Sequence, residues 1–179
     1  MVLSYNELVE LVESGGVENV PLENINGASI DLTLDTPVLF EGARCDWIVR
    51  LADKDTPEME RNHGDTFHLY PRAFCLASTE QVFHLPDDVA CQFVLKSSLA
   101  RAGLNHLMAG WCDPTWNNSA LTMELHNVLS HHTLVLERGM KIGQMVFFRT
   151  TSPVPQHAAY ASRGQYNGDR SVSASKGLR

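Results

Sequence analysis

Beyond its first fifteen residues the sequence is divided into many short runs of strand-forming residues, and this pattern limits the fold more than any other feature. The runs are rich in Val, Ile, Leu, Thr and Phe and are separated by prolines and glycines; they cover residues 29–34, 38–40, 66–70, 73–78, 89–95, 121–127, 133–136 and 142–148. Short strands between closely spaced turn signals are typical of β-barrels and jelly rolls. We therefore predict a fold dominated by β-strands with a few short helices.

Two short helices are predicted within this β pattern. Residues 4–7 have the S-x-x-E form of a capping box, apolar residues follow at helical spacing, and glycines 15 and 16 end the helix. A second helix is predicted over residues 97–102, with Gly103 as its stop. We expect one β domain over residues 1–159 and a flexible, polar tail over residues 160–179. Composition alone favours a frayed terminus. The alternative, indicated by Arg163, Tyr166 and Arg170, is a tail that forms a lid over a bound ligand.

The charge and hydropathy of the chain exclude several classes of function. The 179 residues carry 14 basic and 21 acidic side chains, a net charge of −7, whereas proteins that bind nucleic acid usually have a basic surplus. No apolar run approaches the ~20 residues that span a bilayer, and the first residues do not resemble a secretory signal. We therefore expect a cytoplasmic protein (in the host cytoplasm if the source is a virus) with neither nucleic acid nor membrane as partner.

The cysteines do not follow a metal-binding pattern. Cys45, Cys75, Cys91 and Cys112 form no C-x-x-C pair, so we interpret them as small buried hydrophobic residues in a reducing compartment. The sequence also contains neither H-x-E nor P-C-x-x-C, the paired motifs of one class of catalytic zinc site. We predict that the protein has no metal site of its own.

A candidate anion site lies at the start of the second predicted helix. A strand leads into Lys96, and Ser97 and Ser98 then open the helix, where free backbone N–H groups and hydroxyls can face a phosphate. Arg101 lies one turn further on the same face and can add its planar set of donors. The alternative is that the serines only cap the helix.

A candidate acid/base residue lies in a later strand. Strict alternation puts Glu124 on one face with Thr122 and His126, opposite Met123 and Leu125. Such a carboxylate is either simply solvated or, if it lies in a pocket, has a raised pKa and can transfer protons near neutral pH.

These segments together resemble the dCTP deaminases of the dUTPase-like superfamily. The resemblance rests on KSSLARAGL (96–104), AGWCDP (109–114), TMELHN (122–127) and RGMKIGQ (138–144), with further support from residues 25–32, 69–71 and 85–87. It implies a distorted β-barrel or jelly roll of the dUTPase-like type. It also implies a homotrimer with nucleotide sites between subunits.

The resemblance assigns roles to individual residues. The implied catalytic residues are Glu124 as general acid/base, Ser97 and Arg101 in the catalytic network, and Ala109 in the turn that holds the reactive water. The implied substrate-binding residues are Lys96, Ser98, Arg101, Asp113 near the deoxyribose 3′-hydroxyl, and Tyr160, Gln165, Tyr166 and Asp169 in the tail. Mg²⁺ would arrive on the substrate triphosphate.

The implied reaction is hydrolysis of dCTP to dUTP and ammonia by a glutamate-activated water, without zinc. Gly110-Trp111 resembles the form of members that also cleave the triphosphate, so a bifunctional enzyme giving dUMP and pyrophosphate is an alternative. Two further alternatives are deamination of dCMP or a base-modified dCTP, and a nucleotide sensor without catalysis.

The sequence departs from the family pattern at the turn and in the tail. Met108 stands where a threonine is usual, and Gln165 and Asp169 stand where a lysine and a glutamine are usual. Losing a cation and gaining an anion is unfavourable beside a triphosphate unless Arg163 or Arg170 replaces the lost charge.

Overall fold

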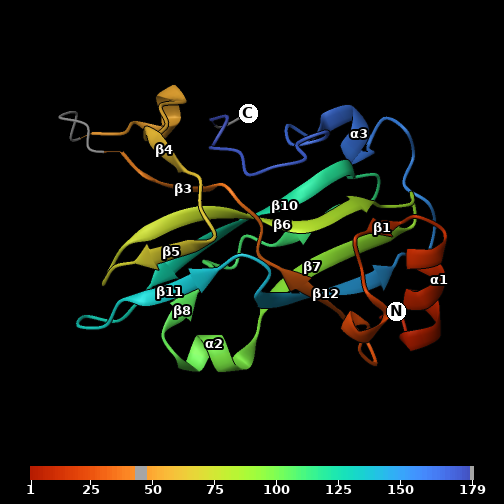
Figure 1. Cartoon of the computed structure of the whole chain (residues 1–179). Helices are drawn as coiled ribbons and strands as arrows, with labels where there is room; N and C mark the ends of the chain where they lie inside the picture. Colours follow the sequence, from red (N-terminus) through yellow and green to blue (C-terminus); the bar gives the residue numbers. More distant parts are fainter. Residues whose placement is uncertain (43–47, 178–179) are drawn as a thin grey trace.

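The computed structural model describes residues 1–42 and 48–177 (Figure 1). Its helices are α1 (Tyr5–Glu13), α2 (Ser97–Arg101) and α3 (Tyr160–Arg163), with 3-10 turns η1 (Leu22–Asn24) and η2 (Leu51–Asp53). Its strands are β1 (Val17–Glu18), β2 (Ile30–Thr33), β3 (Val38–Glu41), β4 (Met59–Asn62), β5 (Thr66–Leu69), β6 (Phe74–His84), β7 (Val89–Leu95), β8 (Leu104–Asn105), β9 (Trp111–Cys112), β10 (Asn117–Asn127), β11 (Leu134–Glu137) and β12 (Lys141–Arg149). The predicted β-dominated fold with a few short helices is confirmed.

The strands form three antiparallel sheets. The largest has the order β4-β3-β6-β10-β8, with β1 also paired to β6; the second has the order β2-β12-β7-β9; and β5 pairs with β11. In Figure 1 the two larger sheets lie one above the other, with α2 at the lower end and α3 and the C-terminal tail at the upper end. The two segments that the sequence singles out, α2 and the tail, therefore lie at opposite ends of the molecule (Figure 1).

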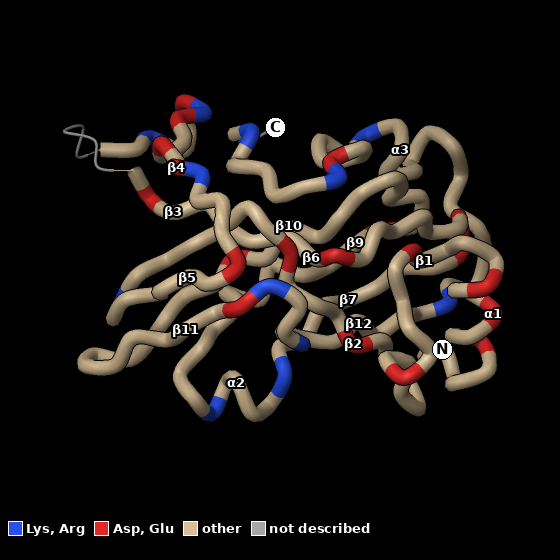
Figure 2. Tube along the Cα trace, in the orientation of Figure 1, with Lys and Arg blue, Asp and Glu red and all other residues tan. Residues whose placement is uncertain are grey.

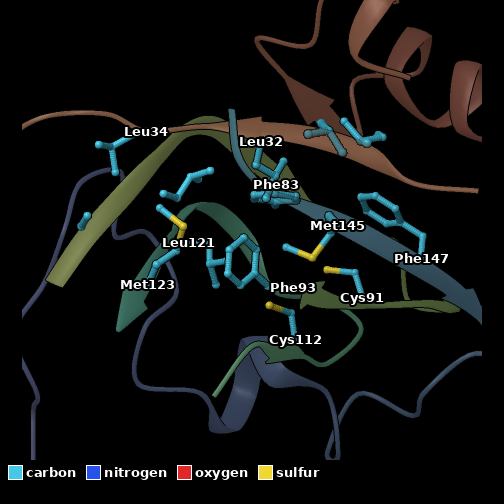
Figure 3. Close-up of a cluster of buried hydrophobic side chains, with 14 of the residues drawn as sticks. Leu32, Leu34, Phe83, Cys91, Phe93, Cys112, Leu121, Met123, Met145 and Phe147 are labelled. Carbon is cyan, nitrogen blue, oxygen red and sulfur yellow. The ribbon is translucent and has the colours of Figure 1, made fainter. Parts of the chain in front are cut away.

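The core is built from the facing sides of these sheets (Figure 3). Phe83 of β6 and Met123 of β10 are fully buried together with Phe93 of β7 and Phe147 of β12, and the ring centroids of Phe83 and Phe147 are 6.4 Å apart. Because alternate residues of a strand point to the same face, each strand contributes a row of apolar side chains. This rigid core supports β10, the strand that carries Glu124.

The predicted strands agree with the structure where apolar residues form continuous runs, and differ at polar stretches. The bounds of β7 are those predicted, whereas β6 and β10 extend to 11 residues each and pair with each other through two register shifts. Four strands were not predicted: β1, β4, β8 and β9. Three of them have only two residues, and β4 reads MERN, so neither length nor hydropathy signals them.

The helix predictions are confirmed with small changes in bounds. The Ser4 backbone N–H donates to the Glu7 carboxylate at 2.9 Å, as expected of a capping box, and α2 ends one residue earlier than predicted. Gly103, which follows α2, has the positive φ of 94° that favours glycine at a helix end. None of the described helices is long and apolar enough to cross a membrane.

Three of the four cysteines are buried, unpaired thiols, as predicted. Cys75, Cys91 and Cys112 are each less than a tenth exposed, and Cys45 lies outside the described residues. Burial raises the pKa of the Cys75 thiol to about 12, so this group stays protonated and behaves as a small apolar side chain.

Candidate active site

Glu124 lies on the outward face of β10, as strand alternation predicts. Thr122, Glu124 and His126 are partly exposed, whereas Met123 and Leu125 are buried. Burial raises the pKa of the Glu124 carboxyl above its ordinary value. A carboxyl group of this kind can take up and release a proton closer to neutral pH than a solvated one.

The Glu124 side chain borders a cavity of about 500 Å³. One part of the wall is apolar and includes Met59, Phe74, Leu76, Trp111 and Trp116; the polar part includes Thr122, Glu124, Tyr160, Tyr166 and Asp169. Cavities of this size, with apolar walls and a few converging polar groups, are typical of small-molecule sites. The lining contains two carboxylates, and within the described residues it contains no lysine or arginine.

The turn before β9 places Ala109 at the edge of this cavity. Leu107 and Met108 both have positive φ, 52° and 61°, and the Asn105 side chain accepts a hydrogen bond from the Leu107 N–H at 2.8 Å. Gly110 packs so closely that a Cβ there would lie 2.7 Å from the Phe93 Cβ. Left-handed backbone at non-glycine residues costs energy and occurs often at functional sites. The role of Ala109 in holding the reactive water stays a prediction.

The two tryptophans beside Asp113 line the cavity in different ways. Trp116 is buried and stacks on Phe83 with ring centroids 5.1 Å apart, so it belongs to both the core and the cavity wall. Trp111 is 57% exposed and donates its indole N–H to Asp113 Oδ1 at 3.0 Å. Asp113 itself lies beside the cavity rather than in its lining.

The predicted phosphate segment does not border this cavity in the same subunit. Ser97, Ser98 and Arg101 are exposed, and their side chains make no hydrogen bond or ion pair within the described part of the chain. The N-cap of α2 is Lys96, so the alternative in which these serines only cap the helix is not supported. Figures 1 and 2 show α2, with basic residues at its two ends, at the end of the molecule opposite α3 and the tail.

Lys96 is held by a nearly buried carboxylate. Its ammonium donates to Asp31 Oδ1 at 2.7 Å, Lys141 approaches Asp31 Oδ2 at 3.2 Å, and Asn26 donates to Oδ1 at 2.8 Å. Burial alone would raise the pKa of Asp31, but the hydrogen bonds from Lys96, Asn26 and Lys141 outweigh it and hold the pKa below its ordinary value. Lys96 therefore links β7 to β2, and its predicted contact with substrate stays a prediction.

We expect Asp31→Asn to destabilise the protein at pH 7 by about 1–3 kcal/mol, because it leaves two lysines without their partner. Since the folded-state pKa of Asp31 lies below the unfolded value of 3.8, its contribution is present above that value and is lost as the pH falls below it. Denaturant titrations should therefore show a difference in the free energy of unfolding between the variant and the wild type, and this difference should become smaller in acid. The exposed Asp53→Asn serves as the control, and a gap independent of pH would contradict the prediction.

The C-terminal tail is ordered along β10, which corrects the expectation of a frayed terminus. The Ala120 N–H donates to the Asp169 carbonyl at 2.8 Å, and the Ser173 N–H donates to Thr122 Oγ1 at 3.2 Å. Val172 is 2% exposed and packs with Leu39 and Leu76. Composition did not reveal this packing, because scattered apolar residues (Tyr160, Val172 and Ala174) and hydrogen bonds of the backbone hold the tail.

The predicted tail residues Tyr160, Tyr166 and Asp169 line the cavity with Glu124. The Tyr160 hydroxyl accepts a hydrogen bond from the Tyr166 N–H at 3.4 Å, and burial raises the pKa of Tyr160. Gln165 lines an adjoining cavity of about 410 Å³, together with Arg163.

The charges of the tail are arranged differently from the expectation. Arg170 is directed away from the cavity, to Glu18 at 2.7 Å and Asn118 at 2.6 Å. Sequence reasoning missed Lys176, which forms a two-point ion pair with the Asp169 carboxylate at 2.7 and 3.0 Å. No local signal marks Lys176, because it lies seven residues beyond Asp169 outside the quoted motifs.

Comparison with known proteins identifies the family of this chain. A sequence model of the family described as dCTP deaminase-like matches residues 2–150. The chain belongs to this family. Its relatives include proteins named dCTP deaminase, dUMP-forming, from Beutenbergia cavernae (36% identical, covering 98% of this chain and 94% of that protein) and Nocardia farcinica (38% identical, covering 98% and 91%).

The fold of this dCTP deaminase-like chain is also found in a solved structure. The 2′-deoxycytidine 5′-triphosphate deaminase from Agrobacterium tumefaciens superposes with a TM-score of 0.68 at 19% identity. The superposition covers 86% of this chain and half the length of that one. At this identity the likeness shows the fold, and the resemblance stated from the sequence motifs is confirmed.

Proposed function

We propose that this protein removes the C4 amino group of dCTP as ammonia by hydrolysis, with a water activated by Glu124 and without zinc. The observation that carries the proposal is the partly buried Glu124 carboxyl, whose raised pKa suits proton transfer, at the wall of a cavity of about 500 Å³. The names of the relatives, dCTP deaminase, dUMP-forming, support dCTP as the substrate.

The proposed chemistry follows from a single carboxylate that moves protons. Glu124 takes a proton from water, and the hydroxide adds to C4 of the cytosine ring. Glu124 delivers this proton to N3. It then takes the proton of the C4 hydroxyl as the C4 carbonyl forms and passes it to the amino group, which leaves as ammonia. Ser97 and Arg101 would orient the water and stabilise the tetrahedral centre.

We further propose that each site is completed by α2 of a neighbouring subunit in a homotrimer. The cavity beside Glu124 has two carboxylates and no cation in its described lining, whereas a triphosphate needs cationic donors. Ser97, Ser98 and Arg101 are exposed and unpaired in the described chain, and they lie at the far end of the same subunit. An assembly in which α2 of one subunit meets β10 of the next would bring the two sets together.

A complementation experiment tests this arrangement. Glu124→Gln and Arg101→Gln are each expected to inactivate the protein when tested alone. If the two residues act from different subunits, unfolding and refolding an equimolar mixture should restore activity at about a quarter of the sites. A mixture of Ser97→Ala with Arg101→Gln is the control that should stay inactive. An inactive mixture of the first pair would contradict the shared site.

The product is proposed to be dUMP rather than dUTP. The relatives are named dUMP-forming, which favours the bifunctional alternative over simple deamination. Two waters are then consumed, giving ammonia and pyrophosphate beside dUMP, and Asp113 is the candidate for readying the second water. Mg²⁺ would be bound by the phosphate oxygens of the substrate, since the described residues contain no cluster of three or more metal-ligating side chains.

Incubation with dCTP and Mg²⁺, followed by ion-exchange separation, tests both steps. We expect dUMP and pyrophosphate. Accumulation of dUTP alone would support deamination and contradict the proposed cleavage of the triphosphate. Absence of any product would remove the proposed function, and parallel incubations with dCMP and base-modified dCTP would show whether another substrate is used. Tight dCTP binding without turnover would instead support a nucleotide sensor.

A further inference from the structure

The cavity beside Glu124 carries negative charge of its own, whatever cations a neighbouring α2 adds. Glu124 and Asp169 both border it, and its described lining contains no lysine or arginine. A nucleoside triphosphate brings several further negative charges. Two ionised carboxylates would repel such a ligand.

Lys176 removes half of this negative charge. Its ammonium lies 2.7 and 3.0 Å from the two Asp169 carboxylate oxygens and donates to the Gln165 carbonyl at 2.8 Å. It also lies 5.0 Å from the centroid of the Tyr166 ring, a cation–π contact. The Gln165 carbonyl and the Tyr166 ring therefore help to hold the Lys176 ammonium against the Asp169 carboxylate.

The backbone of Asp169 is held beside β10. Its carbonyl accepts the Ala120 N–H at 2.8 Å, and the N–H of the preceding Gly168 donates to Ser119 Oγ at 2.9 Å. Both contacts fix the tail to β10, the strand that carries Glu124. The Asp169 carboxylate therefore stays within side-chain reach of the cavity, and Lys176 is the cation that pairs with it.

The other two cations in the described part of the tail have different environments. Arg170 is bonded to Glu18 and Asn118, outside the cavity lining. Arg163 borders the adjoining cavity of about 410 Å³ and not the one that contains Glu124. Within the described chain, Lys176 is the cation paired with a carboxylate of the Glu124 cavity.

We propose that Lys176 is the counter-ion that allows this cavity to accept a polyphosphorylated nucleotide, by neutralising Asp169. The proposal rests on the proposed function for the identity of the nucleotide. It adds Lys176 as a residue whose effect on nucleotide affinity increases with the number of phosphates. Lys176 acts here on binding rather than on the chemistry at C4.

Lys176→Met keeps the stem over Tyr166 but leaves Asp169 uncompensated. We expect KM and the dissociation constant for dCTP to rise about 10- to 30-fold at low salt, with kcat little changed, and the effect to shrink at high salt. The loss should be graded, largest for dCTP, smaller for dCMP and below about twofold for deoxycytidine. A purely structural role of Lys176 would weaken all three ligands equally.

Asp169→Asn in the Lys176→Met background provides the decisive comparison. Removal of the unpaired carboxylate should raise dCTP affinity at least about threefold above that of Lys176→Met alone. Lys176→Arg, which keeps the charge, should behave like the wild type. Equal losses for all ligands, or no rescue by Asp169→Asn, would overturn the proposal.

Binding should be measured by calorimetry as well as by turnover, so that the two proposals fail in different ways. If the wild type binds dCTP without converting it, the proposed function fails while the phosphate-graded affinities still test Lys176. If the wild type turns over dCTP but Lys176→Met has unchanged affinity for it, the proposed deamination is supported and the counter-ion role of Lys176 is contradicted.

Discussion

Replacing Glu124 by Gln is expected to lower kcat for dCTP deamination by about 10²–10⁴-fold, because the amide cannot take a proton from water. Glutamine has nearly the same shape, so the cavity and its nucleotide contacts should persist. Ammonia release measures the loss of turnover, and calorimetry with dCTP measures the retained binding.

The control for this variant is Glu137→Gln, an exposed glutamate of β11 that does not border the cavity. It should leave turnover unchanged. Thermal unfolding of both variants checks that the fold is intact. Turnover by Glu124→Gln within a few-fold of the wild type would remove the proposed mechanism, whatever the product assay gives.

Phe83→Ala is expected to lower the free energy of unfolding by about 3–5 kcal/mol, the largest stability effect that we predict. Phe83 is fully buried, stacks on Trp116 at 5.1 Å and lies 6.4 Å from Phe147. The substitution opens a cavity between the two larger sheets. Because Trp116 also lines the Glu124 cavity, dCTP affinity should fall as well.

Urea titrations at one fixed protein concentration measure this effect, since subunit association would make the apparent stability depend on concentration. Val135→Ala is the control, because Val135 is 48% exposed on β11 and should cost no more than about 0.5 kcal/mol. Similar losses for both variants would contradict the role given to Phe83.

The sequence predicted those parts of the fold in which local pattern and tertiary structure agree. Alternation placed Glu124 on the outward face of its strand, and a continuous apolar run gave the bounds of β7. Residues 117–120 of β10, which read NNSA, were missed because pairing with β6, rather than any propensity of their own, makes them a strand.

The candidate site was only partly predictable for a physical reason. The motifs named Glu124 and the α2 segment together, but one subunit holds them at different places, and the sequence motifs do not give this separation. The ion pair of Lys176 with Asp169 depends on how the tail folds back on itself. That fold is set by backbone contacts to β10, which leave no periodic signal in the sequence.

The tail along β10 also bears on solubility. On the side of β10 away from β6, β8 pairs with residues 126 and 127. Further along β10 the tail takes over, with the Asp169 carbonyl accepting from the Ala120 N–H and the Ser173 N–H donating to the Thr122 hydroxyl. Residues 119–125 read SALTMEL, a run with few charges that would present open backbone groups to other chains. A chain shortened before residue 160 is therefore expected to aggregate through this strand.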